Sequence, residues 1–185
     1  MDLIMKTLRL LVIPLVALMP SLGLTDDPLA TFRGAIGADG VSSAPGPGPV
    51  ATTVNRNIVR GVQPPGQLWA ISAFRAEVGV DGHIRVDGRG LVFAGGDTIG
   101  TALVVTPTGG TATLQVFATL ICENVPPFVE RNTNPVPLAA NGDFRIDDVL
   151  SPPPPASCTT PVLLIRVAGG GNWFAAGIQR FDGRD

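Results

Sequence analysis

The residue types that could perform chemistry are few and lie far apart in the chain. His83 is the single histidine, and as a general base it would need a nucleophile and an orienting carboxylate nearby. The chain has no Gly-x-Ser-x-Gly motif of the kind that carries a hydrolase nucleophile. His83 also follows Asp81-Gly82, a typical hairpin turn. We therefore expect it to be an exposed turn residue.

Three aspartates, Asp143, Asp147 and Asp148, bracket a predicted strand near the C-terminal third of the chain. A pair of carboxylates can hydrolyse a glycosidic bond, and a cluster of three or more oxygens can hold calcium. Asp147 and Asp148 are thus a candidate hydrolase pair, and all three are candidate calcium ligands. They do not follow the twelve-residue calcium-loop pattern, and aspartate is common in turns. A turn or surface role is the favoured interpretation.

Trp69 and Trp173 are the two tryptophans. An indole plane matches the apolar face of a sugar ring, so both are candidate carbohydrate-binding residues. A tryptophan in a small β domain more often fills the core. The chain contains no tyrosine, which makes a sugar-binding platform less favoured than a core position.

Cys122 and Cys158 are the only cysteines. An even number of cysteines in an exported chain predicts a disulfide. No further cysteine or histidine lies near them to complete a metal site. We expect one structural disulfide, with the two Cα atoms within about 7 Å of each other at the same end of the domain.

The N-terminal residues have the three-part layout of a secretory signal peptide. Lys6 and Arg9 form a basic region, residues 10–18 are mostly apolar, and Ser21 and Gly23 suit a signal peptidase. The apolar run is short of the roughly 20 residues that span a bilayer. We expect a cleaved signal peptide over residues 1–23 and no membrane span in the mature chain. The predicted location is secreted, periplasmic or on the cell surface.

The composition excludes several classes of protein. The formal net charge of −2 lacks the basic excess of a nucleic-acid-binding protein, so we expect no nucleic-acid partner. The 23 glycines and 18 prolines follow no collagen period. Phosphate-loop and dinucleotide motifs are absent from the sequence, so we expect no cofactor. Beyond residue 23 the chain has arginine but no lysine, which suggests a GC-rich bacterial genome.

The domain organisation follows from glycine, proline and apolar periodicity. Residues 24–54 are predicted to be a flexible Gly/Pro-rich spacer, because the segment 35–49 shows no apolar periodicity. The ordered domain is expected over residues 55–181, followed by a polar tail over residues 182–185.

Alternating apolar residues and turn signals predict four β-hairpins. They join residues 68–78 to 84–86, 101–106 to 111–122, 136–140 to 143–149, and 161–168 to 173–179. No run has the period of a helix. About eight short antiparallel strands predict an all-β fold, an immunoglobulin-like β-sandwich built from hairpins, with a barrel as the alternative.

Five segments carry a resemblance to known proteins: residues 65–69, 87–92, 118–122, 141–146 and 171–175. Their order resembles that of small secreted bacterial β-sandwich proteins of unassigned function. The resemblance spans residues 60–178. It implies the fold and export, and it implies no catalytic residue.

We therefore expect an exported, non-enzymatic extracellular module with a structural, adhesive or binding role. Its partner would be an extracellular protein or a polysaccharide, and an exposed sheet edge could add a partner strand. A carbohydrate-binding module that uses Trp69 or Trp173 is the alternative hypothesis. A hydrolase that uses Asp147 and Asp148 is the third.

Overall fold

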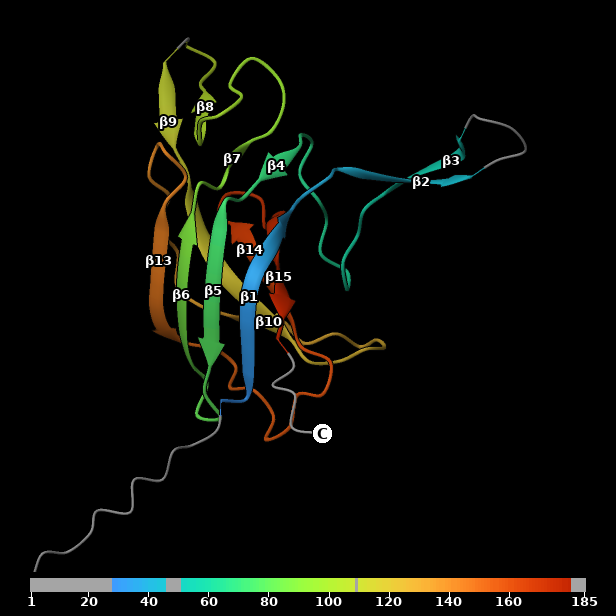
Figure 1. Ribbon diagram of the computed structural model, residues 1–185, viewed down its shortest axis with the longest axis vertical. Coiled ribbons are helices and arrows are strands. Elements are labelled where there is room, and N and C mark those ends of the chain that lie inside the picture. Colours follow the sequence, from blue (N-terminus) through green and yellow to red (C-terminus); the bar gives the residue numbers. More distant parts are fainter. Residues whose placement is uncertain (1–27, 46–50, 109, 181–185) are drawn as a thin grey trace, which may run out of the picture.

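The computed structural model describes residues 28–45, 51–108 and 110–180 (Figure 1). The predicted signal peptide over residues 1–23 and the predicted tail over residues 182–185 lie outside them. The described residues are all β, and they include no helix long and apolar enough to cross a membrane.

The described residues form fifteen strands. These are β1 (Ala30–Gly37), β2 (Val41–Pro45), β3 (Ala51–Arg56), β4 (Trp69–Ala70), β5 (Ala73–Val78), β6 (His83–Arg89), β7 (Val92–Phe93), β8 (Leu103–Val105), β9 (Thr111–Thr113), β10 (Gln115–Ile121), β11 (Arg131–Asn132), β12 (Val136–Pro137), β13 (Phe144–Val149), β14 (Val162–Val167) and β15 (Trp173–Gln179).

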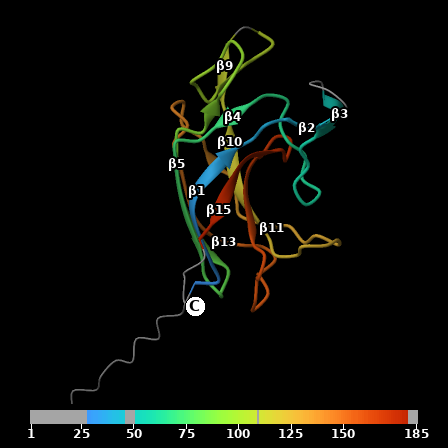
Figure 2. The same ribbon diagram turned by 45° about the vertical axis from the view of Figure 1, so that its right-hand side comes forward.

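Nine strands form one antiparallel sheet in the order β11-β10-β14-β15-β1-β5-β6-β13, with β12 also paired to β10. The sheet curls, so that β13, β6, β5 and β1 form a front wall and β14 and β10 pass behind it (Figures 1 and 2). Asn132 and Ser151 exchange backbone hydrogen bonds of 2.9 Å and link the two ends of the sheet. The structure shows one curled sheet where we expected two packed sheets, and the sandwich and immunoglobulin-like details are not confirmed.

Three further strand pairs lie outside the main sheet: β2–β3, β4–β7 and β8–β9. The β2–β3 pair extends away from the main sheet as a separate arm (Figures 1 and 2). At its base, the side chain of Arg56 donates hydrogen bonds to the side chain of Gln63 at 3.0 Å and to the carbonyl of Pro64 at 2.9 Å.

Three of the four predicted hairpins are confirmed, as β5–β6, β8–β9 and β14–β15. The third is wrong. The Asn141-Gly142 turn does close locally, since the N–H of Gly142 donates to the carbonyl of Ala139 at 2.8 Å. The flanking strands then diverge, with β12 pairing β10 and β13 pairing β6. Pro137 has no N–H with which to extend a ladder toward β13.

The prediction of a flexible spacer over residues 24–54 is wrong for Ala30–Gly37. This segment is strand β1, which lies between β15 and β5 in the main sheet. Phe32 is 0% exposed and joins the core, so the domain begins well before Asn55. Gly37 is needed for close packing, because a Cβ there would lie 1.9 Å from the carbonyl oxygen of Trp69.

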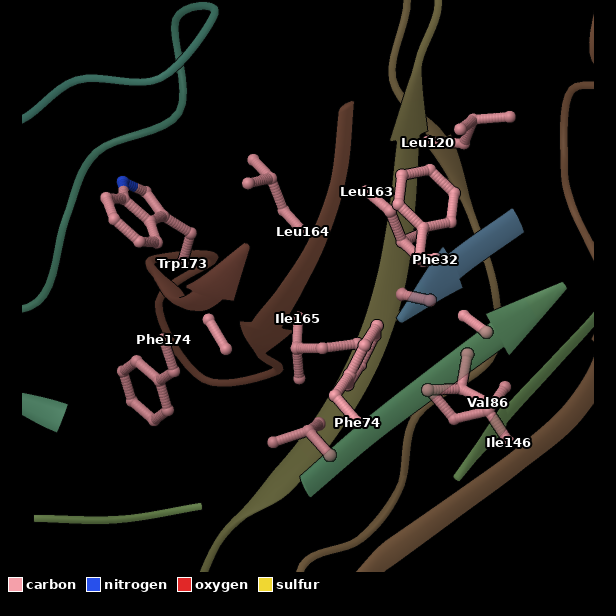
Figure 3. Packing of buried hydrophobic residues seen from close by; sticks show 14 of the residues in the cluster. Phe32, Phe74, Val86, Leu120, Ile146, Leu163, Leu164, Ile165, Trp173 and Phe174 are labelled. Atoms are coloured by element: carbon pink, nitrogen blue, oxygen red, sulfur yellow. The ribbon is translucent and has the colours of Figure 1, made fainter. Parts of the chain in front are cut away.

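The core lies inside the curl of the sheet (Figure 3). On β5 and β6 every second residue is buried, the alternation expected when a strand has one face on the core. Burial of each large apolar side chain contributes about 1.5–3 kcal/mol. The opposite face of β1, β5, β6 and β13 is left open to solvent. That open face is where the polar side chains of these four strands gather.

Candidate functional site

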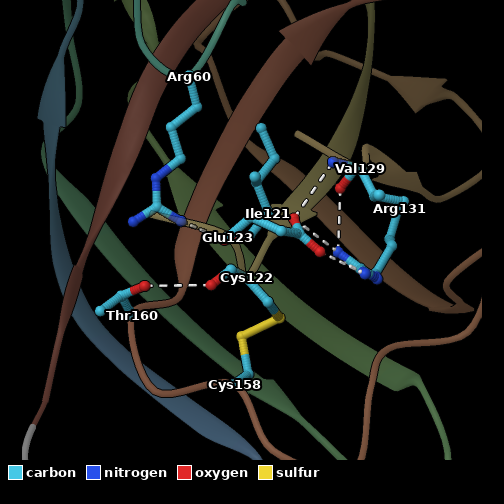
Figure 4. The surroundings of a disulfide bond; sticks show 8 residues. All are labelled: Arg60, Ile121, Cys122, Glu123, Val129, Arg131, Cys158 and Thr160. Carbon is cyan, nitrogen blue, oxygen red and sulfur yellow. Dashed lines mark hydrogen bonds and ion pairs between the residues drawn. A yellow bond between two sulfur atoms is a disulfide. The ribbon is translucent and has the colours of Figure 1, made fainter. Parts of the chain in front are cut away.

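The predicted disulfide is present between Cys122 and Cys158 (Figure 4). The Cα atoms are 5.0 Å apart, within the distance expected from the sequence. The hydroxyl of Thr160 donates to the carbonyl of Cys122 at 3.1 Å and joins the two cysteine segments further. A disulfide is consistent with an extracellular or periplasmic location.

An ion pair lies directly beside the disulfide (Figure 4). Arg131 donates to Glu123 with an Nη2 to Oε1 distance of 2.8 Å, and the N–H of Val129 donates to Oε2 at 3.2 Å. The Arg131 side chain is only 7% exposed, against 26% for Glu123. The hydrogen bond from Arg131 lowers the pKa of Glu123 to about 2. The pair thus joins a buried guanidinium to a partly exposed carboxylate, an arrangement that stabilises the fold.

Both tryptophans lie in the core. Trp69 is 4% exposed and Trp173 is 3% exposed. The Trp69 ring stacks on Phe174 with centroids 4.0 Å apart, and its other neighbour, Phe93, lies at 4.1 Å. The indole N–H of Trp173 donates to the carbonyl of Asn57 at 3.0 Å. The ring faces that a sugar would need are covered by protein, which agrees with the core interpretation.

The structure separates the three candidate aspartates. Asp143 precedes β13 and accepts hydrogen bonds from the N–H of Gly90 at 3.1 Å and from Asn141 at 3.0 Å. Asp147 and Asp148 are neighbours on β13 and therefore point to opposite faces of the sheet. The described part of the chain holds no group of three or more metal-ligating side chains placed to hold a metal ion.

Asp148 is hydrogen-bonded to a neighbouring loop. It accepts hydrogen bonds from the backbone N–H of Asn134 at 2.7 Å and from that residue's side chain at 3.1 Å. The backbone N–H groups of Asn134 and Val149 hold the pKa of the Asp148 carboxyl below its usual range. Asp148 thus holds the short loop between β11 and β12.

Asp147 instead pairs with the histidine. The Nε2 of His83 lies 2.8 Å from Oδ1 of Asp147, and Arg85 lies 3.6 Å from the other oxygen. A hollow of about 300 Å³ beside this pair is lined by Glu77, Gly79, Val80, Asp81, His83 and Arg85. No hydroxyl or thiol is among these lining side chains, so the histidine–aspartate pair has no nucleophile to activate there.

The open face of β1, β5, β6 and β13 carries two rows of polar side chains that run across the strands. The strand register places four residues opposite one another in what we call the arginine row: Arg33, Arg75, Asp87 and Arg145. The next row, called the mixed row, contains Thr31, Glu77, Arg85 and Asp147. The arginine row and most of the mixed row line a depression of about 240 Å³.

The arginine row has an excess of positive charge. Arg33 and Arg75 are direct cross-strand neighbours, an arrangement in which like charges repel. The carboxylate of Asp87 lies next to Arg75 and Arg145 but pairs with Arg89 at 3.4 Å. Within the described residues, neither Arg33, Arg75 nor Arg145 forms an ion pair with a carboxylate.

This face is a candidate site that the sequence alone did not indicate. The sequence does contain part of the pattern, namely charged residues at every second position of a strand. Arg75 and Glu77 form this pattern on one strand, and Arg145 and Asp147 form it on another. The sequence alone does not join these charges into one surface, because it predicts residues 30–37 to be spacer and pairs residues 143–149 with residues 136–140. The order β1-β5-β6-β13 is what assembles it.

Comparison of the chain with protein-family models, with curated proteins and with solved structures finds no significant match. Guanidinium groups that lack carboxylate partners can bind carboxylate, sulfate or phosphate through paired hydrogen bonds. The open face is thus equipped to hold an anion at an exposed surface.

Proposed function

We propose that this protein is an exported, non-enzymatic module that binds an anionic extracellular ligand on the open face of β1, β5, β6 and β13. The observation that carries the proposal is the cross-strand pair of Arg33 and Arg75, with Arg145 further along the same row. Adjacent like charges destabilise a sheet. An anion that binds between them removes this repulsion and gains charge-assisted hydrogen bonds.

A non-enzymatic role is supported by the arrangement of the titratable groups. His83 has an orienting carboxylate in Asp147 but no nucleophile among the side chains that line the adjacent hollow. Asp147 and Asp148 point to opposite faces of the sheet. Export is supported by the N-terminal sequence pattern and by the disulfide between Cys122 and Cys158.

The test is a pair of charge-matched variants. Arg75→Gln removes one arginine from the depression, whereas Arg56→Gln removes the same charge from the base of the β2–β3 arm. Binding of the disulfide-intact protein to polygalacturonate, dextran sulfate and polyphosphate would be measured by calorimetry. Loss of one exposed ion pair, ~1 kcal/mol, should weaken binding about fivefold in Arg75→Gln.

The control variant Arg56→Gln should bind as tightly as the wild-type protein. Equal weakening in both variants would mean that net charge, and not the open face, governs binding. Absence of binding to every polyanion, with the fold intact by circular dichroism, would overturn the proposal. Turnover of a substrate that is abolished by His83→Gln would show that the module is an enzyme instead.

A further inference from the structure

The carboxylates of the open face restrict which anion can bind there. Glu77 follows Arg75 at the second position on β5, Asp87 lies between two arginines on β6, and Asp147 pairs with Arg85 on β6. Five arginines and three carboxylates share the outer face of these four strands: Arg33, Arg75, Arg85, Arg89, Arg145, Glu77, Asp87 and Asp147. The face is therefore positive overall but contains negative groups throughout.

A densely charged polyanion fits this pattern poorly. A polyphosphate or polysulfate lying along the arginine row would bring negative groups against Asp87 and Glu77, and each such contact opposes binding. A ligand with widely spaced carboxylates and hydroxyl groups between them avoids this repulsion. Its carboxylates can accept from the arginine forks, and its hydroxyls can donate to the acidic side chains.

We infer that the ligand is an acidic polysaccharide whose uronate carboxylates bind the arginine row, an inference that rests on the proposed function above. Arg33, Arg75 and Arg145 span three strand spacings, a distance of ~14 Å. The depression of about 240 Å³ is lined by the whole arginine row and by Thr31, Glu77 and Arg85 of the mixed row. A row of arginines that extends across four strands suits a chain of sugars that crosses the strands, because it is longer than a single small ligand.

The side chains of the two rows also disfavour a lipid surface and single-stranded nucleic acid. The arginine row and the mixed row contain no aromatic or aliphatic side chain. Binding in the headgroup region needs an apolar face that enters the membrane, and nucleic-acid binding of this kind uses aromatic rings on which bases stack. The two rows offer neither, and the exposed apolar side chains of these strands, Ile36 and Val149, lie at strand ends outside the rows.

A substitution at Glu77 tests whether the carboxylates of the open face discriminate between dense and widely spaced polyanions. Glu77→Gln removes a carboxylate that lines the depression and lies opposite Arg85, and it leaves the size of the side chain unchanged. If Glu77 repels dense polyanions, the affinity for dextran sulfate should rise about threefold in this variant. The affinity for polygalacturonate should not rise, because its hydroxyls lose an anionic acceptor. Asp97→Asn, which removes one negative charge from an exposed loop, is the matched control and should change neither affinity.

The experiment measures the affinity of the disulfide-intact wild-type protein for four probes in one buffer. These are polygalacturonate, its methyl ester, dextran sulfate and vesicles of phosphatidylglycerol. We expect the tightest binding to polygalacturonate and none to the uncharged ester. Tighter binding to dextran sulfate or to the vesicles would overturn the uronate assignment and leave the proposed anionic site standing. Equal binding of the ester, or binding of none of the four, would overturn both.

Discussion

Replacing Glu123 with glutamine removes the carboxylate that pairs with a buried arginine beside the disulfide. In the wild-type protein Glu123 accepts two hydrogen bonds from Arg131, at 2.8 and 3.3 Å, and one from the N–H of Val129 at 3.2 Å. The Arg131 side chain is 7% exposed, and its Nε has no hydrogen-bond partner among the residues that the structure describes. The Glu123→Gln variant therefore leaves a buried cation with a neutral partner.

The loss of unfolding free energy in Glu123→Gln should lie between the values for a fully buried ion pair and for an exposed one. Breaking a fully buried ion pair costs about 3–5 kcal/mol, and an exposed pair contributes about 0–1 kcal/mol. Glu123 is 26% exposed and the glutamine oxygen can still accept one hydrogen bond. We expect the free energy of unfolding at neutral pH to fall by about 2 kcal/mol.

The contribution of Glu123 to stability should decrease as the pH falls. Chiefly because of the hydrogen bond from Arg131, the pKa of Glu123 in the folded protein is about 2, below its value of about 4.3 in an unfolded chain. The carboxylate therefore contributes fully above about pH 4.3, and the contribution is lost as the pH falls toward about 2. Over this window the wild-type protein should lose stability and approach the Glu123→Gln variant.

The assay is urea unfolding of both proteins, with the disulfide intact, at a series of pH values from about 7 to about 2. Asp97→Asn, an exposed loop substitution, is the control and should follow the wild-type curve. If the difference in unfolding free energy between wild type and Glu123→Gln stays constant over the whole range, the assigned role of the Glu123 carboxylate is refuted.

Three further predictions concern the core and the disulfide. The double variant Cys122→Ala/Cys158→Ala should lose about 4 kcal/mol of unfolding free energy on the chain-entropy model, because the bridge closes a separation of 36 residues; urea unfolding checks this. Gly88→Ala should lose about 1–3 kcal/mol by overpacking, because a Cβ there would lie 2.2 Å from a facing phenylalanine ring; its melting temperature should fall below that of Gly66→Ala, where the space is empty. Both tryptophans should emit at short wavelength and resist acrylamide quenching, since they are 4% and 3% exposed; strong quenching would contradict the core packing.

The parts of the fold that could be predicted depend on residues near one another in the chain. The β5–β6 hairpin follows from Asp81-Gly82, whose glycine has a φ of 84° that other residues avoid. Alternation of buried and exposed residues on either side sets which face is inside. The β14–β15 hairpin, across residues 169–172, was predictable on the same grounds.

The errors arose where neighbours in space are distant in sequence. Strand β1 contains a register shift between Phe32 and Ala35, so its apolar alternation is interrupted and too brief to be recognised. Trp69 was expected to share a strand with Phe74, but it belongs to β4, which pairs β7. The partner of β13 is β6, more than fifty residues earlier in the chain, and no local pattern indicates it.

By itself, the sequence determined the all-β class, three of the four hairpins and the disulfide, because alternation, turn residues and cysteine number are properties of short stretches or of the whole composition. Only the tertiary structure decided that the strands form one curled sheet, that both indoles are buried, and that Arg33, Arg75 and Arg145 share a row. The physical reason is that strand order and register are set by long-range packing of buried faces. The charged side chains on the opposite face are brought together as a consequence of that packing.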